Sequence, residues 1–325
     1  MKPLLLSPVG KDYLWGGNRL NDRFSKNIDM YPLAETWECS VHIDGPSVVL
    51  CEEFYGKTLR EVLKEHPEFL GTKYKSVDEF PILIKLIDAN KPLSIQVHPD
   101  DDYARIHENG SLGKTEMWYV VDSKEDSELI YGFNRDVNSE IVRSSIEEGT
   151  LEKYLQKEKI RKDDIFFINP GQIHAIGEGA LIAEVQENSN ITYRLYDYDR
   201  EDKNGNKREL HIDKALDVSN LSKSKVPRQP MRVMHYYRGY ATELLGRNQY
   251  FQVERMMINT ERIRELATVS VGEDSFSVLL CIDGSASMIT ENDNQPIFKG
   301  DCIFLPAGCK NVKFHGKSTF LKVDC

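Results

Sequence analysis

The stretch KPLSIQVHPDDDYARIHENGSLGKTE, residues 91–116, carries the polar residues around which the rest of the chain is arranged. Its segment LSIQVH alternates apolar and polar residues, a pattern that is typical of a β-strand. Side chains two apart on a strand face the same side, so Ser94, Gln96 and His98 are expected to point together. Three polar side chains on one face of an apolar strand are costly to bury without partners. The pattern therefore predicts a shared partner, and a metal ion is one candidate.

Two later residues are candidates for the same centre. Glu116 begins the apolar strand EMWYVV, and His174 follows the Pro-Gly turn of INPGQIHAIG. Strands and a turn of this kind can converge inside a small β-barrel and bring both residues to Gln96 and His98. The combined nitrogen and oxygen donors suit zinc, and also manganese, cobalt or iron(II). Plainer interpretations stay open. Gln96 and His98 could be a buried polar pair bonded to the backbone, Glu116 an exposed charge at a strand start, and His174 a turn histidine.

Composition limits the class of protein. The chain has 325 residues, 40% of them hydrophobic and 29% charged, which is typical of an ordinary globular protein. Its net charge of -10 argues against nucleic-acid or anionic-membrane partners, although local cations can still hold an anionic substrate. We find no signal peptide and no apolar run of about 18 residues, and therefore expect a cytoplasmic protein. The six cysteines are scattered without a CxxC pair, so we expect reduced thiols.

Strand patterns dominate the chain, with few helical ones. Thr58 and Glu61 form a capping-box pair before a short apolar stripe, which predicts a helix. PILIKLI is apolar throughout, as in a strand buried on both faces. Residues 138–158 show helical periodicity and are expected to form two short helices inserted between strands. IDKALDV is expected to be another short helix, and KSKVPRQP is the best linker candidate.

The C-terminal third repeats the strand pattern of the first part. Turn signals recur every 8–12 residues from about residue 232, which favours a sandwich or barrel. DDIFFINPGQIH and KGDCIFLPAGCKN share the order Asp, apolar strand, Pro, Gly, polar, which supports two related β domains. In the second copy Asn311 falls near the position of His174, and no Gln-x-His precedes it. We therefore expect a metal-binding domain over residues 1–225 and a domain without metal over residues 232–325.

Four motifs in order, PLSIQVHPDD, GKTEMWYV, PGQIHAIG and ENSNITYR, resemble type I mannose-6-phosphate isomerases of the short bacterial form, in the cupin superfamily. KDYLWGG and ETWECS near the N-terminus are also similar to that family. The resemblance is strong over roughly residues 1–200, and the C-terminal stretch is similar only to a degenerate cupin. It implies a mainly β protein with two cupin-type barrel or jelly-roll domains and short helical insertions.

The resemblance also implies an activity and its residues. The implied enzyme interconverts mannose 6-phosphate and fructose 6-phosphate through a cis-enediol, with one zinc ion per chain. The positions that match the family's functional residues are Gln96, His98, Glu116 and His174 for zinc, Arg194 for the active site, and Ser94 and Lys114 near the substrate phosphate.

Alternatives remain open for several of these residues. Lys114 and Glu116 could form a solvated ion pair, and Arg194 could lie on a surface strand. If its face lines a cavity, Arg194 would stay charged and act as an electrostatic stabiliser. The base is not identified; a metal-coordinated water, Glu38, Lys114 and His98 are all candidates. A non-catalytic sugar-phosphate-binding cupin and an iron(II) oxygen-using cupin are the competing functions, and the protein is expected to be a monomer or a homodimer.

Overall fold

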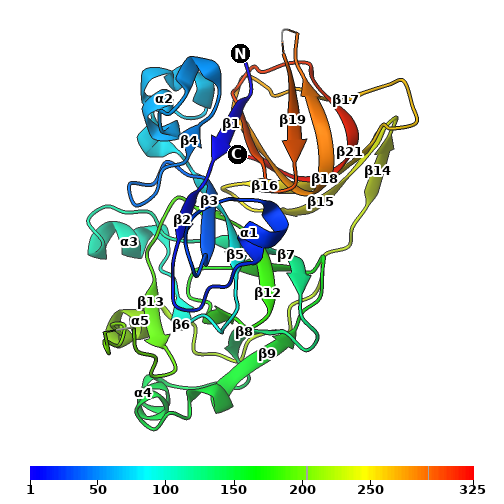
Figure 1. Ribbon diagram of the computed structural model, residues 1–325. Helices are drawn as coiled ribbons and strands as arrows, with labels where there is room; N and C mark the ends of the chain where they lie inside the picture. The colour runs from blue at the N-terminus through cyan, green and yellow to red at the C-terminus, as the bar shows by residue number, and fades with distance from the viewer. Residues whose placement is uncertain (203, 292) are drawn as a thin grey trace.

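The computed structural model describes residues 1–202, 204–291 and 293–325, and these form a mainly β protein. Its strands pair into three sheets of antiparallel strands, which confirms the predicted fold class. Figure 1 shows the sheet of the C-terminal region at one end of the molecule, the six-stranded sheet next to it in the middle and the five-stranded sheet toward the opposite end. No described helix is both long and apolar enough to cross a membrane.

Two sheets build the half of the molecule that holds the predicted site residues. The six-stranded sheet has the order β10 (Ile165–Ile168), β7 (Glu116–Ser123), β12 (Ala180–Glu187), β5 (Ile82–Asp88), β3 (Glu35–Cys39) and β2 (Val9–Lys11). The five-stranded sheet has the order β13 (Tyr193–Tyr196), β6 (Ile95–Val97), β11 (His174–Ile176), β8 (Glu128–Phe133) and β9 (Leu155–Lys159). An apolar cluster that includes Trp15, Trp118 and Phe166 draws residues from both sheets and packs them together.

The third sheet has ten described strands and belongs mainly to the C-terminal region. Its order is β14 (Met234–Tyr237), β15 (Tyr240–Arg247), β16 (Gln252–Asn259), β21 (Val312–Asp324), β18 (Ser277–Ile289), β20 (Cys302–Leu305), β1 (Leu4–Ser7) and β4 (Val48–Val49), with β17 (Ala267–Val269) beside β21 and β19 (Asn294–Phe298) beside β18. The N-terminal strand β1 therefore pairs with β20 of the C-terminal region. We propose that residues 1–225 and 232–325 are two units joined through β1 and β4.

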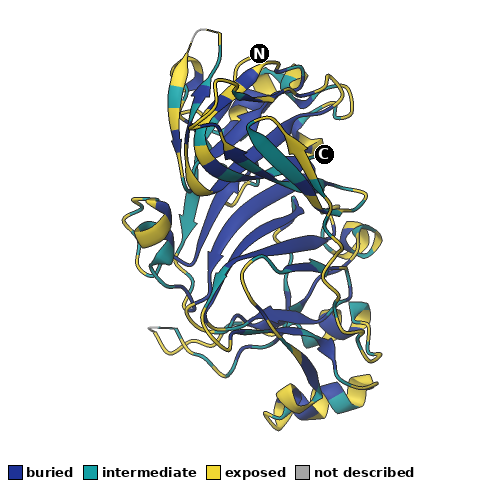
Figure 2. Cartoon of the chain, turned by 90° about the vertical axis from the view of Figure 1, so that its right-hand side faces the viewer, coloured by how far each residue is buried: buried dark blue, intermediate teal, exposed yellow. Residues whose placement is uncertain are grey.

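Short helices cover the outside of these sheets. They are α1 (Arg19–Phe24), α2 (Leu59–Glu65), α3 (Asp101–His107), α4 (Ser139–Glu147) and α5 (Ile212–Val218), with 3₁₀ turns at Glu52–Phe54, Pro67–Leu70, Val77–Glu79 and Leu151–Tyr154. The predicted capping box is confirmed, because Thr58 and Glu61 exchange hydrogen bonds at the start of α2. Figure 2 shows exposed residues gathered on helices and loops and buried residues along the strands.

The predicted helical insert is only partly helical. Residues 139–147 form α4 and 151–154 a 3₁₀ turn, but residues 155–159 form strand β9 at the edge of the five-stranded sheet. Apolar residues at 151 and 155 continued the helical spacing, yet Leu155 pairs with Phe133 of β8 instead. Tertiary pairing thus overrides a local periodic pattern.

Candidate functional site

A row of three residues crosses neighbouring strands of the five-stranded sheet. Gln96 on β6 pairs with His174 on β11 at one side and with Arg194 on β13 at the other. Residues directly opposite in an antiparallel pair have side chains on the same face, so all three point to one side of the sheet. Segments far apart in the sequence therefore meet at β6, the strand from which the site was predicted.

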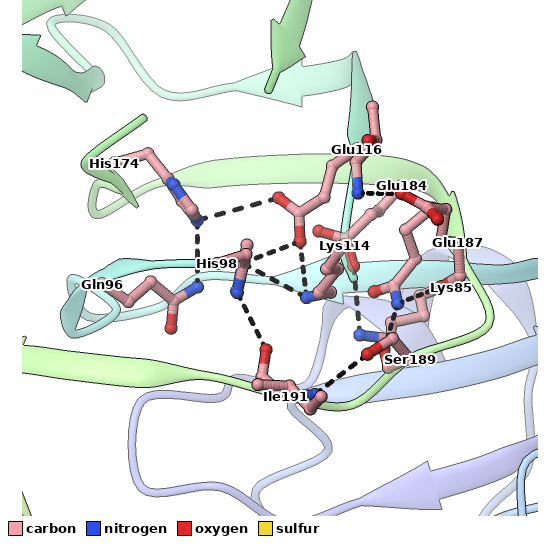
Figure 3. A network of polar contacts seen from close by, with 12 residues as sticks. Lys85, Gln96, His98, Lys114, Glu116, His174, Glu184, Glu187, Ser189 and Ile191 are labelled. Atoms are coloured by element: carbon pink, nitrogen blue, oxygen red, sulfur yellow. Dashed lines mark hydrogen bonds and ion pairs between the residues drawn. The ribbon is translucent and has the colours of Figure 1, made fainter. Parts of the chain in front are cut away.

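His98, Glu116 and His174 gather at this face, with one donor atom from each within 4.8 Å of the others. The Nε2 atom of His98 lies 3.2 Å from Oε1 of Glu116, and Nε2 of His174 lies 3.8 Å from Oε2. Figure 3 shows the carboxylate of Glu116 turned toward both rings. All three side chains are buried, with at most 1% of each residue exposed.

Both histidines are oriented by backbone carbonyl groups. Nδ1 of His98 lies 2.9 Å from the carbonyl oxygen of Ile191, and Nδ1 of His174 lies 2.8 Å from that of Gln172. A carbonyl oxygen only accepts, so each Nδ1 carries the proton and each Nε2 presents a lone pair. Burial lowers the pKa of both rings, and Lys114 lowers that of His98 further, to about 3. The rings are therefore neutral, which is the form that binds metal.

Glu116 is the charged member of the group. Burial alone would raise its pKa, but the adjacent ammonium of Lys114 holds it well below the ordinary value, so the carboxylate is anionic. Lys114 Nζ lies 2.5 Å from Oε1, yet neither oxygen has a hydrogen bond of acceptable geometry in the buried site. Buried carboxylate oxygens without such bonds, next to two imidazole lone pairs, fit the donor set of a divalent cation.

Gln96 lies at the edge of this group. Its side-chain amide nitrogen is 3.3 Å from Nε2 of His174, and the residue is half-buried. Amide oxygen and nitrogen can exchange places by a flip of the side chain, which would turn the oxygen toward the histidines. The structure thus brings all four sequence candidates to one place, with the three ionisable residues most tightly grouped.

A cavity of about 270 Å³ opens beside the group. Its lining residues come from both sheets and from the N-terminal segment: Tyr13, Trp15, Glu35, Lys85, Ile87, Leu93, Ser94, Gln96, Lys114, Trp118, Ile176, Glu184, Asn190, Thr192, Arg194 and Arg208. Four of these residues are cationic, on a protein whose net charge is -10. Local cations of this kind favour an anionic ligand.

Sequence reasoning missed Lys85 and Glu184 on the wall of the cavity. Lys85 Nζ lies 3.1 Å from Oε1 of Glu184, whose Oε2 accepts a hydrogen bond from the indole of Trp118 at 2.8 Å. Burial would lower the pKa of Lys85, but Glu184 and Glu35 raise it above its ordinary value. Burial and the charge of Glu116 raise the pKa of Glu184. The signal was a single charge inside each of two apolar strands, PILIKLI and ALIAEV.

Arg194 lies half-buried on the same face as Gln96. Its Nη1 donates to the carbonyl of Glu209 at 2.8 Å, and its Nε lies 3.4 Å from Oγ of Ser94. Arg208, a second arginine in the cavity lining, pairs with the buried carboxylate of Asp197. One guanidinium group, that of Arg194, therefore stands next to Ser94, and a second, that of Arg208, lines the same cavity.

Glu38 is the one candidate base that the structure removes from the site. It lies on β3 between Thr36 and Lys26, with the ammonium of Lys26 at 2.6 Å and the hydroxyl of Thr36 at 2.5 Å. Its neighbour Glu35 lines the cavity, and residues three apart on a strand face opposite sides. The prediction that Glu38 is a candidate base is therefore wrong.

The fold and the site together define a class: a cupin-type β protein with a candidate His/Glu/His metal group beside a cationic cavity. Comparison with known proteins narrows the class. Residues 4–146 match the family described as phosphomannose isomerase type I, catalytic domain, and residues 241–324 match mannose-6-phosphate isomerase, cupin domain.

Relatives match along nearly the whole chain. The mannose-6-phosphate isomerase ManA of Bacillus subtilis is 38% identical over 319 residues, 97% of this chain and 96% of that protein. That of Streptococcus mutans is 36% identical, over 97% and 96% of the two chains. A crystal structure of the mannose 6-phosphate isomerase from Bacillus subtilis matches with a TM-score of 0.90 at 37% identity, covering 99% of both chains. The chain belongs to the type I phosphomannose isomerase family, as the sequence motifs predicted.

Proposed function

We propose that the protein interconverts mannose 6-phosphate and fructose 6-phosphate by proton transfer through a cis-enediol. The observation that carries this proposal is the buried His98, Glu116 and His174 group beside a cationic cavity, in a chain related along its length to enzymes with this activity. The cavity has room for a small sugar phosphate and offers positive charge for the phosphate.

Gln96, His98, Glu116 and His174 would hold one divalent cation, with zinc the best fit to the neutral imidazole and carboxylate donors. Bound there, the cation supplies Lewis-acid polarisation to an oxygen of the substrate. The residues of the chain bind and orient the sugar and move its proton. The Nδ1 contacts of the two histidines keep the donor atoms directed at the centre.

We assign the phosphate to the side of the cavity that holds Ser94 and Lys114, with Arg208 as an additional cation. Lys114 is already paired with Glu116, so its charge is largely compensated within the protein. Arg208 and Arg200 share the single carboxylate of Asp197, so this group keeps a net positive charge that would help to balance a phosphate dianion, and the hydroxyl of Ser94 would donate to a phosphate oxygen.

We assign the proton transfer to Glu184 in place of the earlier candidates. His98 would use its lone pair for the cation, and Lys114 forms an ion pair with Glu116. Glu184 faces the cavity and has a raised pKa, which suits a group that takes a proton from C2 and returns it to C1. Lys85, charged beside it, and Arg194 would stabilise the negative charge that develops on the enediol oxygens.

A coupled assay with mannose 6-phosphate, run with chelator and again after metal is restored, tests this function. We expect turnover that the chelator abolishes and zinc restores. Binding without turnover in the metal-loaded protein would contradict the isomerase and favour a sugar-phosphate-binding cupin. Run in deuterated water, the reaction is expected to place solvent deuterium in the product, whereas a hydride shift would leave it out.

A further inference from the structure

Two carboxyl groups outside the cavity hold the segment that precedes Glu116. The backbone N–H of Gly113 donates to Oδ1 of Asp101 at 2.8 Å, and the N–H of Thr115 donates to Oε2 of Glu187 at 2.7 Å. Asp101 begins α3, and Glu187 ends β12. Lys114, between the two donors, also donates its backbone N–H to Pro99 at 3.0 Å. The positions of Lys114 and Glu116 therefore depend on these anchors.

The segment is seated closely against the start of α3. A Cβ atom on Gly113 would lie 2.4 Å from the carbonyl carbon of Asp100 and 2.5 Å from the nitrogen of Asp101. Backbone atoms cannot move aside as a flexible side chain can, so only glycine fits here. The segment has little freedom to shift while Asp101 stays in place.

The C-terminal region reaches the same anchor. The hydroxyl of Tyr250, between β15 and β16, donates to Oδ2 of Asp101 at 2.8 Å. Asp101 thus accepts from Gly113 on one oxygen and from Tyr250 on the other. Tyr250 is absent from the cavity lining, and its hydrogen bond to Asp101 gives it an indirect route to the site.

Glu187 and Asp101 also face each other as two acids. Burial raises the pKa of Glu187 to about 7, and the charge of Asp101 adds to the increase. Oε1 of Glu187 is buried, and no described residue donates a hydrogen bond to it. One proton on that oxygen would supply the missing donor, as in other carboxyl pairs that share a proton.

The other charged groups near the Glu187 carboxyl are paired with one another. Lys114 and Glu116 pair with each other on the cavity side of the segment, and Lys85 pairs with Glu184. Figure 3 shows Glu187 on β12, with the Lys114–Glu116 pair turned toward the histidines. Asp101 from α3 faces the Glu187 carboxyl, whereas Tyr250 donates to Asp101 and has its pKa raised by burial, Asp101 and Glu187.

We propose that Asp101, Glu187 and Tyr250 form a clamp, closed by one proton shared between the two acids, that positions Lys114 and Glu116 for metal binding and catalysis. They are positioning residues, because they act on the site through the backbone of residues 113–115. The inference rests on the proposed function, because the clamp positions residues for that reaction. It makes the C-terminal sheet a contributor to the active site through Tyr250.

The clamp predicts different outcomes for two amide substitutions. Glu187→Gln replaces the shared O–H by an N–H donor and keeps the acceptor for Thr115, so kcat/KM is expected to stay close to wild type. Asp101→Asn removes an acceptor that is needed for Gly113, Tyr250 and Glu187, so kcat/KM is expected to fall about tenfold or more. Equal losses of kcat/KM in both variants, or no loss in either, would contradict the proposal that the two acids share a proton.

The pH profile gives a signature that a merely structural role would not produce. Wild type is expected to lose kcat/KM as the pH rises through about 7, where Glu187 gives up its proton. Glu187→Gln cannot ionise, so the ratio of wild type to this variant should fall across that range. A ratio that does not change with pH would contradict the proposal.

Zinc affinity separates this inference from the proposed function, since it needs no substrate. Competition with a fluorescent chelator is expected to show about tenfold weaker zinc binding in Asp101→Asn and severalfold weaker binding in Tyr250→Phe. Tyr240→Phe, which alters a tyrosine that stacks on Tyr237 in the same sheet, is the matched control and should bind as wild type does. Unchanged zinc affinity in both clamp variants would overturn the clamp even if the enzyme turns over mannose 6-phosphate.

Discussion

The surroundings of Glu116 and Glu184, two glutamates near one cavity, shift their pKa values in opposite directions. Glu116 stands beside Lys114, whose charge lowers its pKa against the effect of burial. The pKa of Glu184 is raised by burial and by the charge of Glu116. Pairs of acids whose pKa values are pushed apart commonly divide the roles of ligand and proton carrier. At the scale of the residue, each glutamate has a lysine in contact, and the difference lies in the balance: Lys114 outweighs burial at Glu116, whereas burial and the charge of Glu116 outweigh Lys85 at Glu184.

Glu184→Gln tests the proton carrier. The amide keeps the size of the side chain but cannot take a proton, so kcat is expected to fall by about 10² to 10⁴-fold. Zinc content should stay at one ion per chain, because Glu184 is not among the candidate ligands. Steady-state kinetics with metal analysis checks this, and a variant that retains full kcat would exclude Glu184 as the base.

Arg194→Ala tests the electrostatic role of the arginine beside Gln96. Loss of the guanidinium is expected to lower kcat by about 10² to 10³-fold while the metal stays bound. Arg194→Lys would restore the charge but not the hydrogen bond to the Glu209 carbonyl, and an intermediate rate is expected. Wild-type rates in the alanine variant would show that Arg194 has no part in the reaction.

At the scale of the element, alternation along β3 decides which glutamate can act. Glu35 lines the cavity, whereas Glu38 faces the opposite side of the six-stranded sheet with Lys26. Both the carboxylate of Glu38 and the ammonium of Lys26 are almost fully buried. A buried pair of this kind acts on stability, because removal of one partner leaves an uncompensated charge.

Glu38→Gln is therefore expected to change stability without changing the chemistry. Loss of the partner of Lys26 should lower the free energy of unfolding by about 3 to 5 kcal/mol. The kcat of the folded variant should remain close to wild type. Urea unfolding together with kinetics measures both quantities, and a stable variant with lost kcat would return Glu38 to the list of candidate bases.

The sequence predicted those elements in which the local residue spacing matches the tertiary contacts that the element makes. The Ser94–His98 alternation, the capping box of α2 and the buried strand β5 all follow from residue spacing. Residues 155–159 were misjudged because their pairing with β8 is a tertiary contact that no local period contains. Lys85 was overlooked because its neighbours read as a buried strand, and its partner Glu184 is 99 residues away.

The residues of the candidate site could be predicted from the sequence where they lie within recognisable motifs. Gln96 and His98 could be named from the alternation in LSIQVH, and Glu116 and His174 because each begins an apolar strand. The clamp of Asp101, Glu187 and Tyr250 could not be found in this way, since its members come from a helix start, a strand end and the C-terminal sheet. Only the folded chain brings these residues together.

At the scale of the whole molecule, the three sheets are tied into one structure around the site. Strand β1 pairs with β20, and one apolar cluster joins the outer face of the six-stranded sheet to the C-terminal sheet. Arg255 on β16 adds an ion pair to Asp163 at 2.8 Å. The C-terminal region therefore supports the sheet that presents Glu116 and Glu184, although its own residues do not line the cavity.

Stability is expected to depend on pH through Glu187. Its pKa is raised in the folded protein from 4.5 to about 7, so the folded state binds the proton more tightly than the unfolded chain does. This contribution is fully present below pH 4.5 and is lost as the pH rises through about 7. Thermal unfolding of metal-free protein should therefore show a fall between about pH 5 and 8 that is smaller in Glu187→Gln. Parallel curves for the two proteins would contradict the assignment.

A titration of metal-free protein with zinc, in wild type and in His98→Ala and His174→Ala, tests the metal site most directly. We expect one zinc ion per chain in wild type, with binding greatly weakened in both variants and activity lost in step with the metal. Tight binding of one zinc ion by both variants would exclude this site, because the cation would then be held by residues other than His98, Glu116 and His174.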